Sequence, residues 1–340
     1  MALISLKDLL NHAREHKYAV GAFNMTNIDF VDTVIEAAVE QNSPLILQLA
    51  EVHFRYLNLE HIAPAIIRAA KDVNTPICIH LDHGEKFETV VRAIRAGFTS
   101  VMFDGSKYPL EENIAKTKEV IKVARSVGVS VEAELGSVGG EVIGVAAPTP
   151  KEADRAAFTN VEEARRFVQE TGVDALAVSI GNVHGTYKGD PNLDFEILEQ
   201  IRDAVNIPLV LHGGSGIYDE DFRKAITLGI CKINFYTEMS TAAINKAKEF
   251  LIQNPDCISY PDLANIAMEE AKAKVKNRME VFGSKDVCAS EKTFCLTCDD
   301  QSCGLTDPKM QPEADTMIYN KLVESLSNEI ISSIVKSKLK

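Results

Sequence analysis

Short apolar runs alternate along most of this 340-residue chain with longer segments in which apolar residues recur every three or four positions. The short runs indicate buried parallel strands, and the three-to-four spacing indicates helices with one buried face. The expected strands lie at residues 18–24, 45–50, 77–84, 99–103, 130–135, 175–180, 208–211 and 231–235. The expected helices lie at residues 3–16, 28–41, 59–73, 87–96, 110–127, 161–171, 195–205, 220–228, 239–252 and 260–281.

Eight expected strands, each followed by a helix, occupy about 250 residues, which is typical of a (β/α)8 TIM barrel of the α/β class. Periodicity alone does not show that the sheet closes, so an open doubly wound sheet is the alternative. We expect residues 1–255 to form the catalytic barrel and residues 256–340 a C-terminal helical extension. The extension contains a loop at residues 283–312 and a final amphipathic helix at residues 314–340, which we expect to pack on the barrel or on a neighbouring subunit.

Residues 136–158 interrupt the alternation. Gly139, Gly140, Gly144 and the Pro148-Thr149-Pro150 run do not fit regular structure, and the stretch is longer than an ordinary connection between a strand and a helix. Because it follows the carboxyl end of a strand, we favour a mobile active-site lid over a disordered insertion.

The composition restricts the range of partners. A formal net charge of −13 argues against nucleic acid and against an anionic membrane surface. Residues 1–18 carry several charged side chains, and nowhere do about 18 apolar residues follow one another, so the pattern indicates neither a signal peptide nor a membrane span. We therefore expect a cytoplasmic protein whose seven cysteines are free or metal-bound.

Three of the expected strands each deliver one histidine at the carboxyl end, where parallel α/β folds place ligand sites: His83, His184 and His212. Three histidines with one open position form a catalytic zinc site, whereas a single histidine is usually an ordinary polar residue. Asp82 is the acid-base candidate, and its alternative role is to support a histidine. His80 lies on the same side of the strand and is a further supporting residue.

Two segments indicate phosphate binding. The glycine-rich residues 213–216 precede a helix, and residues 234–237 end the last strand, which are positions where barrel enzymes commonly bind phosphate. Backbone N–H groups and a helix N-terminus supply positive potential there in spite of the negative net charge. Lys188 is a candidate for an additional cation, although a glycine-rich turn by itself is usually only a turn.

Six short motifs lie at or near the ends of the expected strands: His80-Leu81-Asp82-His83-Gly84, Phe103-Asp104-Gly105-Ser106, Val131-Glu132-Ala133-Glu134-Leu135-Gly136, Gly181-Asn182-Val183-His184-Gly185, His212-Gly213-Gly214-Ser215-Gly216 and Lys232-Ile233-Asn234. Together, and in this order, they resemble the motifs of the class II, metal-dependent ketose-bisphosphate aldolases, such as those that act on fructose or tagatose bisphosphate. The resemblance implies a zinc ion on the three histidines, with Asp104 and Glu134 near an alternative or outward metal position.

The same resemblance implies further roles. Asp82 would be the acid-base group on the acceptor side, and Asn24 would lie near the substrate. A monovalent cation, Na⁺ or K⁺, would accompany the phosphate, and the protein would be a homodimer or homotetramer. The residues expected to hold dihydroxyacetone phosphate are Gly185, Lys188, Gly213, Ser215, Asn234 and Thr237.

Some positions depart from the family pattern. The family usually has an acidic residue two positions after the loop's glycine pair, and here Glu141 is followed by Val142. Either Glu141, our second catalytic candidate, takes over proton transfer or that transfer differs. Phe235-Tyr236 replaces a small or acidic pair, and Ala50 stands where a hydroxyl residue is frequent. Because these positions border the substrate, the acceptor sugar is open.

One cysteine cluster lies outside the resemblance. Its Cys-x-x-Cys core is able to bind zinc or an iron–sulfur cluster, but we favour an exposed insertion with reduced thiols. The clustered residues are Cys288, Cys295, Cys298 and Cys303, and the other cysteines, expected to be small core residues, are Cys78, Cys231 and Cys257.

The sequence predicts a zinc-dependent aldolase that reversibly cleaves a ketose 1,6-bisphosphate, or a ketose 1-phosphate, to dihydroxyacetone phosphate and an aldehyde such as glyceraldehyde 3-phosphate. A Schiff base on Lys232 ranks lower because it leaves the three histidines without a purpose. The alternative from a different class is a non-catalytic sugar-phosphate-binding or assembly protein on an aldolase scaffold, for which Val142 and the Phe235-Tyr236 pair are the motivation.

Overall fold

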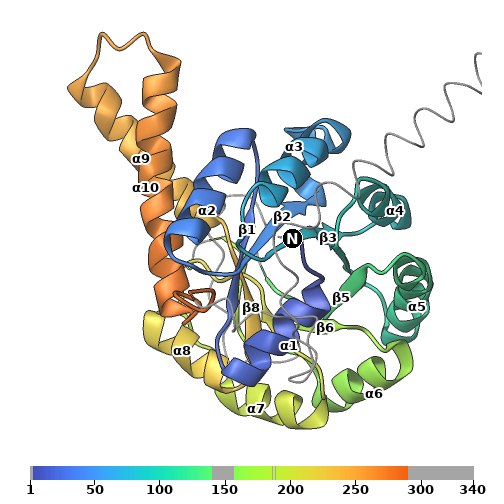
Figure 1. Ribbon diagram of the computed structural model, residues 1–340. Coiled ribbons are helices and arrows are strands. Elements are labelled where there is room, and N and C mark those ends of the chain that lie inside the picture. Colours follow the sequence, from blue (N-terminus) through green and yellow to red (C-terminus); the bar gives the residue numbers. More distant parts are fainter. Residues whose placement is uncertain (1–2, 140–156, 186, 188, 290–340) are drawn as a thin grey trace, which may run out of the picture. The chain divides into compact units, whose positions relative to one another are not determined.

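Eight parallel strands close into a barrel in the order β1 to β8, with β8 hydrogen-bonded back to β1 (Figure 1). The computed structural model describes residues 3–139, 157–185, 187 and 189–289. Closure confirms the predicted (β/α)8 barrel and excludes the open doubly wound sheet. The strands are β1 (Val20–Asn24), β2 (Leu45–Ala50), β3 (Ile77–Gly84), β4 (Ser100–Phe103), β5 (Ser130–Leu135), β6 (Ala175–Val178), β7 (Leu209–Leu211) and β8 (Ile230–Phe235).

Each strand is followed by a helix, and the observed helices lie within a few residues of the predicted ones. They are α1 (Leu6–His16), α2 (Ile28–Glu40), α3 (Leu59–Lys71), α4 (Phe87–Arg95), α5 (Leu110–Ser126), α6 (Val161–Thr171), α7 (Phe195–Ala204), α8 (Asp219–Thr227), α9 (Thr237–Gln253) and α10 (Tyr260–Val281). The first helix begins three residues later than predicted because the Ser5 hydroxyl accepts a hydrogen bond from Asp8 N and caps the helix there. A short 3₁₀ helix, η1 (Glu51–Arg55), was not predicted.

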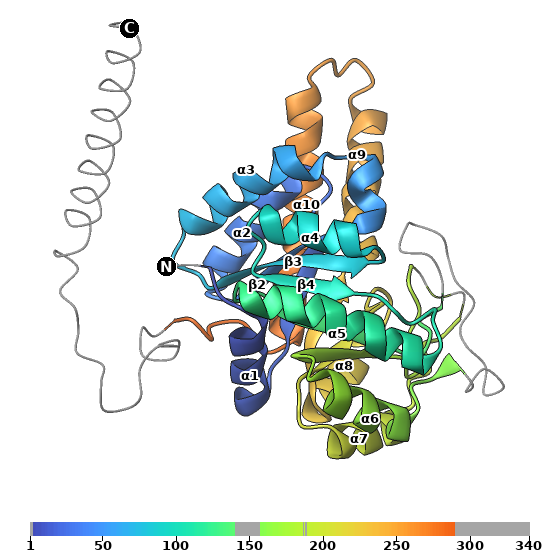
Figure 2. The same ribbon diagram turned by 90° about the vertical axis from the view of Figure 1, so that its right-hand side faces the viewer.

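Helix α1 closes the amino-terminal end of the barrel. Leu6, Leu9 and Leu10 have no exposed surface and pack into a core cluster with inward-facing residues of the strands. In Figure 2 the arrows of β3 and β4 point away from the end of the barrel where α1 lies. Cys78 and Cys231 are buried in this cluster, as predicted, whereas the prediction of a core position is wrong for Cys257, which is only partly buried between α9 and α10. The amino end is therefore filled with apolar side chains, and the carboxyl end is left for chemistry.

Helices α9 and α10 form an antiparallel pair that extends past the barrel (Figures 1 and 2). Near the barrel α10 packs against α2, where Lys272 pairs with Glu36 at 3.0 Å. At the far tip the apolar residues Ile252, Ile258 and Tyr260 are 80%, 100% and 71% exposed. The division of the chain at residue 255 stays a prediction.

Several predicted segments lie partly or wholly outside the described residues. They are most of the predicted lid at residues 136–158, most of the cysteine-containing loop with Cys295, Cys298 and Cys303, and the final helix at residues 314–340.

Candidate active site

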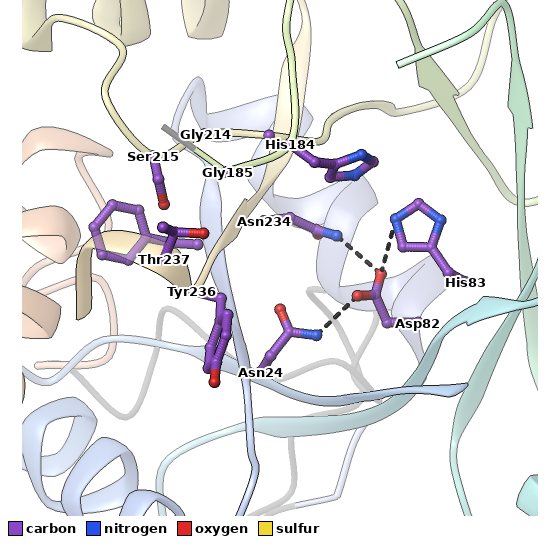
Figure 3. Close-up of a pocket in the computed structure, with 12 residues that line it drawn as sticks. Asn24, Asp82, His83, His184, Gly185, Gly214, Ser215, Asn234, Tyr236 and Thr237 are labelled. Carbon is purple, nitrogen blue, oxygen red and sulfur yellow. Dashed lines mark hydrogen bonds and ion pairs between the residues drawn. The ribbon is translucent and has the colours of Figure 1, made fainter. Parts of the chain in front are cut away.

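The candidate site is a pocket at the carboxyl end of the barrel (Figure 3). Strands β1, β3 and β8 and the loops after β6 and β7 contribute its walls. The residues that line it are Asn24, Asp82, His83, His184, Gly185, Gly213, Gly214, Ser215, Asn234, Phe235, Tyr236 and Thr237.

A distortion at the end of β3 brings two consecutive residues into this pocket. In a regular strand Asp82 and His83 would point to opposite faces. The pairing of β3 with β4 shifts register between Leu81 and Gly84, and His83 has a φ of 45°, a left-handed conformation that non-glycine residues rarely adopt. Backbone strain of this kind is concentrated at functional sites, and here it places a carboxylate beside an imidazole.

The three predicted histidines come together. The ring centroid of His83 lies 4.9 Å from that of His184 and 4.6 Å from that of His212. One ring nitrogen of each histidine lies within 4.8 Å of the corresponding nitrogens of the other two. Nε2 of His83 and Nε2 of His184 are buried without a hydrogen-bond partner in the described part of the chain, and Nδ1 of His212 lies 3.0 Å from Glu134 Oε2. Three converging imidazole nitrogens fit the ligand set of a divalent metal with an open position.

Carboxylates fix the orientation of two of these rings. His83 Nδ1 lies 2.8 Å from Asp104 Oδ2, and His212 Nε2 lies 3.0 Å from Glu132 Oε1. Such partners select the tautomer whose other nitrogen faces the metal. His83, Asp104 and Glu134 form a second group with ligand atoms within 4.8 Å of one another.

The electrostatics of the cavity also favour a cation. Burial by itself lowers the pKa of His83, but Asp82 and the hydrogen bond to Asp104 raise it to about 10. Burial raises the pKa of the Glu134 carboxyl, and the charge of Asp104 raises it further. The cavity thus holds positive charge in place, as a proton or as a metal ion.

Asp82 lies between two amides. Asn24 Nδ2 donates to Oδ2 at 2.8 Å and Asn234 Nδ2 donates to Oδ1 at 2.9 Å (Figure 3). Gln48 and Lys232 orient these amides, since each donates to the amide oxygen, at 2.9 and 2.8 Å. Although burial raises the pKa of Asp82, the adjacent His83 and His212 hold it well below its usual range, so the carboxylate stays ionised.

Lys232 and Glu132 form an ion pair inside the barrel. Lys232 Nζ donates to Glu132 Oε1 at 3.1 Å and to Asn234 Oδ1 at 2.8 Å, and it lies 3.0 Å from Glu132 Oε2. These contacts hold the amino group as a hydrogen-bond donor, which argues against the Schiff-base alternative. Burial raises the pKa of Glu132, but Lys232, His212 and His80 together outweigh burial and lower this pKa to about 2.

The predicted phosphate-binding residues Gly185, Gly213, Ser215 and Thr237 all line the pocket. Gly213 has a φ of 64°, and a Cβ atom there would lie 2.1 Å from Val183 O, so this turn requires glycine. The Ser215 hydroxyl accepts a hydrogen bond from the backbone N–H of Glu238 in the first turn of α9. Backbone N–H groups of this turn and the start of α9 form a suitable environment for an anion.

Other predicted site residues lie elsewhere or outside the described residues. Asp104 and Glu134 adjoin the histidines but do not line the pocket. Lys188 and Glu141 lie outside the described residues. The structure adds residues that the sequence did not assign to the site: Gln48, Glu132 and Lys232 as a positioning residue. Gly214, Phe235 and Tyr236, which lie in segments predicted to border the phosphate or the substrate, also line the pocket. Strand alternation was the available signal, because Glu132 and Lys232 are two residues from Glu134 and Asn234.

The closed barrel and its histidine-aspartate centre are typical of metal-dependent barrel enzymes. The family model described as "Fructose-bisphosphate aldolase class-II" matches residues 4–287, and the chain belongs to that family. It is an aldolase, a carbon–carbon lyase, of the metal-dependent class, with a small phosphorylated sugar as substrate.

Named relatives and solved structures agree with this assignment. The chain is 42% identical over 289 residues to the "Probable fructose-bisphosphate aldolase" of Bacillus subtilis strain 168, covering 84% of this chain and 99% of that one. It is 41% identical over 292 residues to the fructose-bisphosphate aldolase of Geobacillus stearothermophilus, covering 85% and 100%. The crystal structure of the YdjI aldolase from Escherichia coli K12 is similar with a TM-score of 0.73 and 35% identity, covering 83% and 98%. No helix among the described residues is long and apolar enough to span a membrane.

Proposed function

We propose that this protein is a zinc-dependent aldolase that reversibly cleaves a ketose 1,6-bisphosphate, or a ketose 1-phosphate, to dihydroxyacetone phosphate and an aldehyde such as glyceraldehyde 3-phosphate. The observation that carries this proposal is the convergence of three histidine nitrogens next to the ionised, amide-bound carboxylate of Asp82. Family membership supports the reaction class.

The proposed roles follow from residue chemistry. His83, His184 and His212 would hold the zinc, with Asp104 and Glu134 at an outward position. Zinc, when bound, would supply Lewis-acid stabilisation of negative charge that develops on the ketose oxygens.

Asp82 would move the proton of the C4 hydroxyl. In cleavage it takes this proton while the C3–C4 bond breaks, the C4 oxygen becomes the aldehyde carbonyl, and the electron pair of the bond passes toward the C2 carbonyl. In condensation Asp82 returns the proton. We propose Glu141 for the proton transfer at C3 and Asn24 as a substrate-binding group; the amide of Asn24 already donates to Asp82.

Dihydroxyacetone phosphate would bind on the opposite side of the pocket from β2. The proposed contacts are Gly185, Lys188, Gly213, Ser215, Asn234 and Thr237, and a monovalent cation, Na⁺ or K⁺, would accompany the phosphate. Neutral backbone donors at the start of α9 support this assignment.

We also propose a cytoplasmic homodimer or homotetramer with no nucleic-acid or membrane partner. The exposed apolar tip of the α9–α10 pair supports self-association, since Ile252 and Ile258 are 80% and 100% exposed. The free thiols among the described cysteines, Cys78, Cys231, Cys257 and Cys288, support a reducing compartment.

The proposal is tested without a choice of aldehyde. Purified protein is incubated with dihydroxyacetone phosphate in heavy water, with and without a chelator, and the C3 proton signal is followed by NMR. We expect loss of the signal that the chelator abolishes and that added zinc restores. Absence of exchange in protein shown to contain one zinc per subunit contradicts the proposal and favours the non-catalytic binder.

A further inference from the structure

One buried histidine has no part in the centre described above. His53 lies in η1, directly after β2, and is 1% exposed. Neither Nδ1 nor Nε2 of its ring has a hydrogen-bond partner among the described residues. Buried polar groups are almost always paired, so two unpaired nitrogens on one ring call for an explanation, and a ligand that supplies the partner is one.

The position of His53 connects it to the pocket. The last residue of β2, Ala50, pairs in register with Asp82 of β3, so η1 begins beside the proposed base. The imidazole packs against the ring of Tyr236, with centroids 5.0 Å apart and planes at 52°. Because β8, β1 and β2 are neighbours in the barrel, this ring contact crosses the end of β1, where Asn24 lies.

Tyr236 is the part of this pair that reaches the pocket. Its ring lines the pocket next to Asn24 (Figure 3), and His53 packs against it from outside the lining. The Tyr236 side chain is partly exposed, whereas His53 is buried behind it. Two unpaired polar atoms thus lie directly behind a ring that lines the pocket.

Under the proposed function, the other walls of the pocket bind zinc or the phosphate of dihydroxyacetone phosphate. The zinc ligands come from β3 and from the loops after β6 and β7, and the proposed phosphate contacts follow β6, β7 and β8. The side formed by Asn24 of β1 and by Tyr236 is left for the other half of the ketose. That half is the acceptor aldehyde.

The chemistry of the pair suits a hydroxyl group. The charged groups that act on His53 are Asp82 and Arg55, and burial, the largest effect, lowers its pKa. A neutral imidazole offers one donor and one acceptor, as a hydroxyl group does. The described residues that line the pocket include no lysine or arginine that would pair with a second phosphate.

We propose that His53 and Tyr236 form the acceptor subsite, in which the Tyr236 ring moves aside and His53 hydrogen-bonds a hydroxyl of an unphosphorylated hydroxyaldehyde. The inference rests on the proposed function. Because the acceptor aldehyde carries no phosphate, the ketose substrate would be a ketose 1-phosphate. His53 is then a specificity-determining residue, because a site built around a hydroxyl group rejects an analogue that lacks it.

The test compares aldehydes that differ in this group. Condensation with dihydroxyacetone phosphate is measured for D-glyceraldehyde, propanal and glyceraldehyde 3-phosphate. We expect the zinc-loaded wild-type protein to prefer D-glyceraldehyde over propanal by about 100-fold in kcat/KM. In His53→Phe this ratio should fall about tenfold, and in His53→Gln it should be partly retained. In Tyr236→Phe, which keeps the ring that moves aside, the ratio should stay close to the wild-type value. His61→Phe, on the exposed surface of α3, is the matched control and should keep the wild-type ratio.

A second readout needs no substrate. Phenylalanine removes two unpaired buried nitrogens from a similar ring shape, so His53→Phe should raise Tm by about 1–3 °C. A lower Tm would mean that the imidazole is a structural group, which contradicts the inference.

The outcomes separate this inference from the proposed function. No proton exchange with dihydroxyacetone phosphate in the zinc-loaded wild-type protein overturns both. Exchange together with an unchanged glyceraldehyde-to-propanal ratio in His53→Phe overturns the acceptor subsite alone. If the wild-type protein prefers glyceraldehyde 3-phosphate over D-glyceraldehyde, the acceptor is phosphorylated, and the acceptor-subsite inference is overturned while the proposed function stands.

Discussion

Lys232 and Glu132 pair inside the barrel at 3.0 Å, where neither side chain has any exposed surface. From this pair one contact runs from Glu132 to His212 and another from Lys232 to Asn234, which donates to Asp82. A single buried ion pair therefore orients both a proposed zinc ligand and the amide that holds the proposed base.

Removal of one partner of this pair should lower the stability of the folded protein. Lys232→Met leaves the Glu132 carboxylate in the interior without its lysine partner, so we expect the free energy of unfolding to fall by about 3–5 kcal/mol in urea titrations. Adding Glu132→Gln to that variant should recover part of the loss because the two sites are coupled. The control is Lys246→Met, which breaks an exposed pair with Glu249 and should change stability by less than about 0.5 kcal/mol. A loss below about 1 kcal/mol in Lys232→Met would refute the role of the pair.

Asp82→Asn keeps the shape of the side chain but removes its ability to accept a proton. We expect kcat for cleavage to fall by about 10²–10⁴-fold, with one zinc per subunit retained. Steady-state kinetics and elemental analysis measure the two quantities on the same preparation. Asp256→Asn, on the exposed tip between α9 and α10, serves as control and should leave kcat unchanged. If Asp82→Asn loses less than about tenfold in kcat, another group is the base.

Asp104→Asn should weaken metal binding without abolishing it. The carboxylate contacts His83 Nδ1 at 2.8 Å, and partners of this kind typically contribute 10–100-fold in metal affinity, so a loss of about that size is expected. Competition with a chromogenic chelator gives the affinity. Asp203→Asn, an exposed residue of α7, is the control. Unchanged affinity in Asp104→Asn would show that His83 is oriented by other contacts.

Gly213→Ala should damage the proposed phosphate site. The added Cβ would lie 2.1 Å from Val183 O at a φ of 64°, so the turn must move. We expect KM for dihydroxyacetone phosphate in the exchange reaction to rise at least tenfold, on the order of a lost hydrogen bond to a charged group. Gly128→Ala tests conformational strain alone, since its φ is 73° with nothing within 4 Å, and should cost about 1 kcal/mol of stability with KM unchanged. Equal effects of the two variants on KM would argue against the site.

Two buried thiols should be unreactive in the folded protein. Burial raises the pKa of Cys78 and of Cys231 from 9.0 to about 12, so both stay protonated in the folded state at pH 8, and only thiolates react with iodoacetamide. Mass spectrometry should find them unlabelled at pH 8 and labelled in urea. Because the folded state binds these protons more tightly, their contribution to stability is present below pH 9 and is lost as the pH rises toward 12. Labelling of either residue under native conditions would contradict the prediction.

The strands and the three histidines were predictable from sequence because each depends on local pattern. Apolar runs gave the strands, and the parallel arrangement gathers residues that follow them, so His83, His184 and His212 could be grouped without a structure. The turn after β2 carried no such signal. Its 3₁₀ helix and the contact of His53 with Tyr236 depend on which strands are neighbours when the barrel closes, since β8 and β2 meet only across β1.

Other features depended on exact backbone geometry. The bulge that turns His83 toward Asp82 has no mark in the sequence, because a regular strand would have sent the two side chains to opposite faces. The sequence leaves a Schiff base on Lys232 as a lower-ranked alternative, and only the distances to Glu132 and Asn234 reveal a positioning role. Buried polar networks are set by three-dimensional contacts between distant strands, which residue spacing does not encode.

Helix α1 packs across the amino end of the barrel, so the two ends of the barrel should differ in how well they tolerate substitutions. A shortened or extended N-terminus that displaces Leu6, Leu9 or Leu10 opens the barrel floor and is a folding defect, whatever the substrate. The loops at the carboxyl end do not close the barrel in this way. Substitutions around η1 and Tyr236 can therefore change which aldehyde is accepted while the barrel itself stays the same. Directed evolution of new acceptor preferences should accordingly leave α1 intact and accumulate its changes in the loops of the opposite rim.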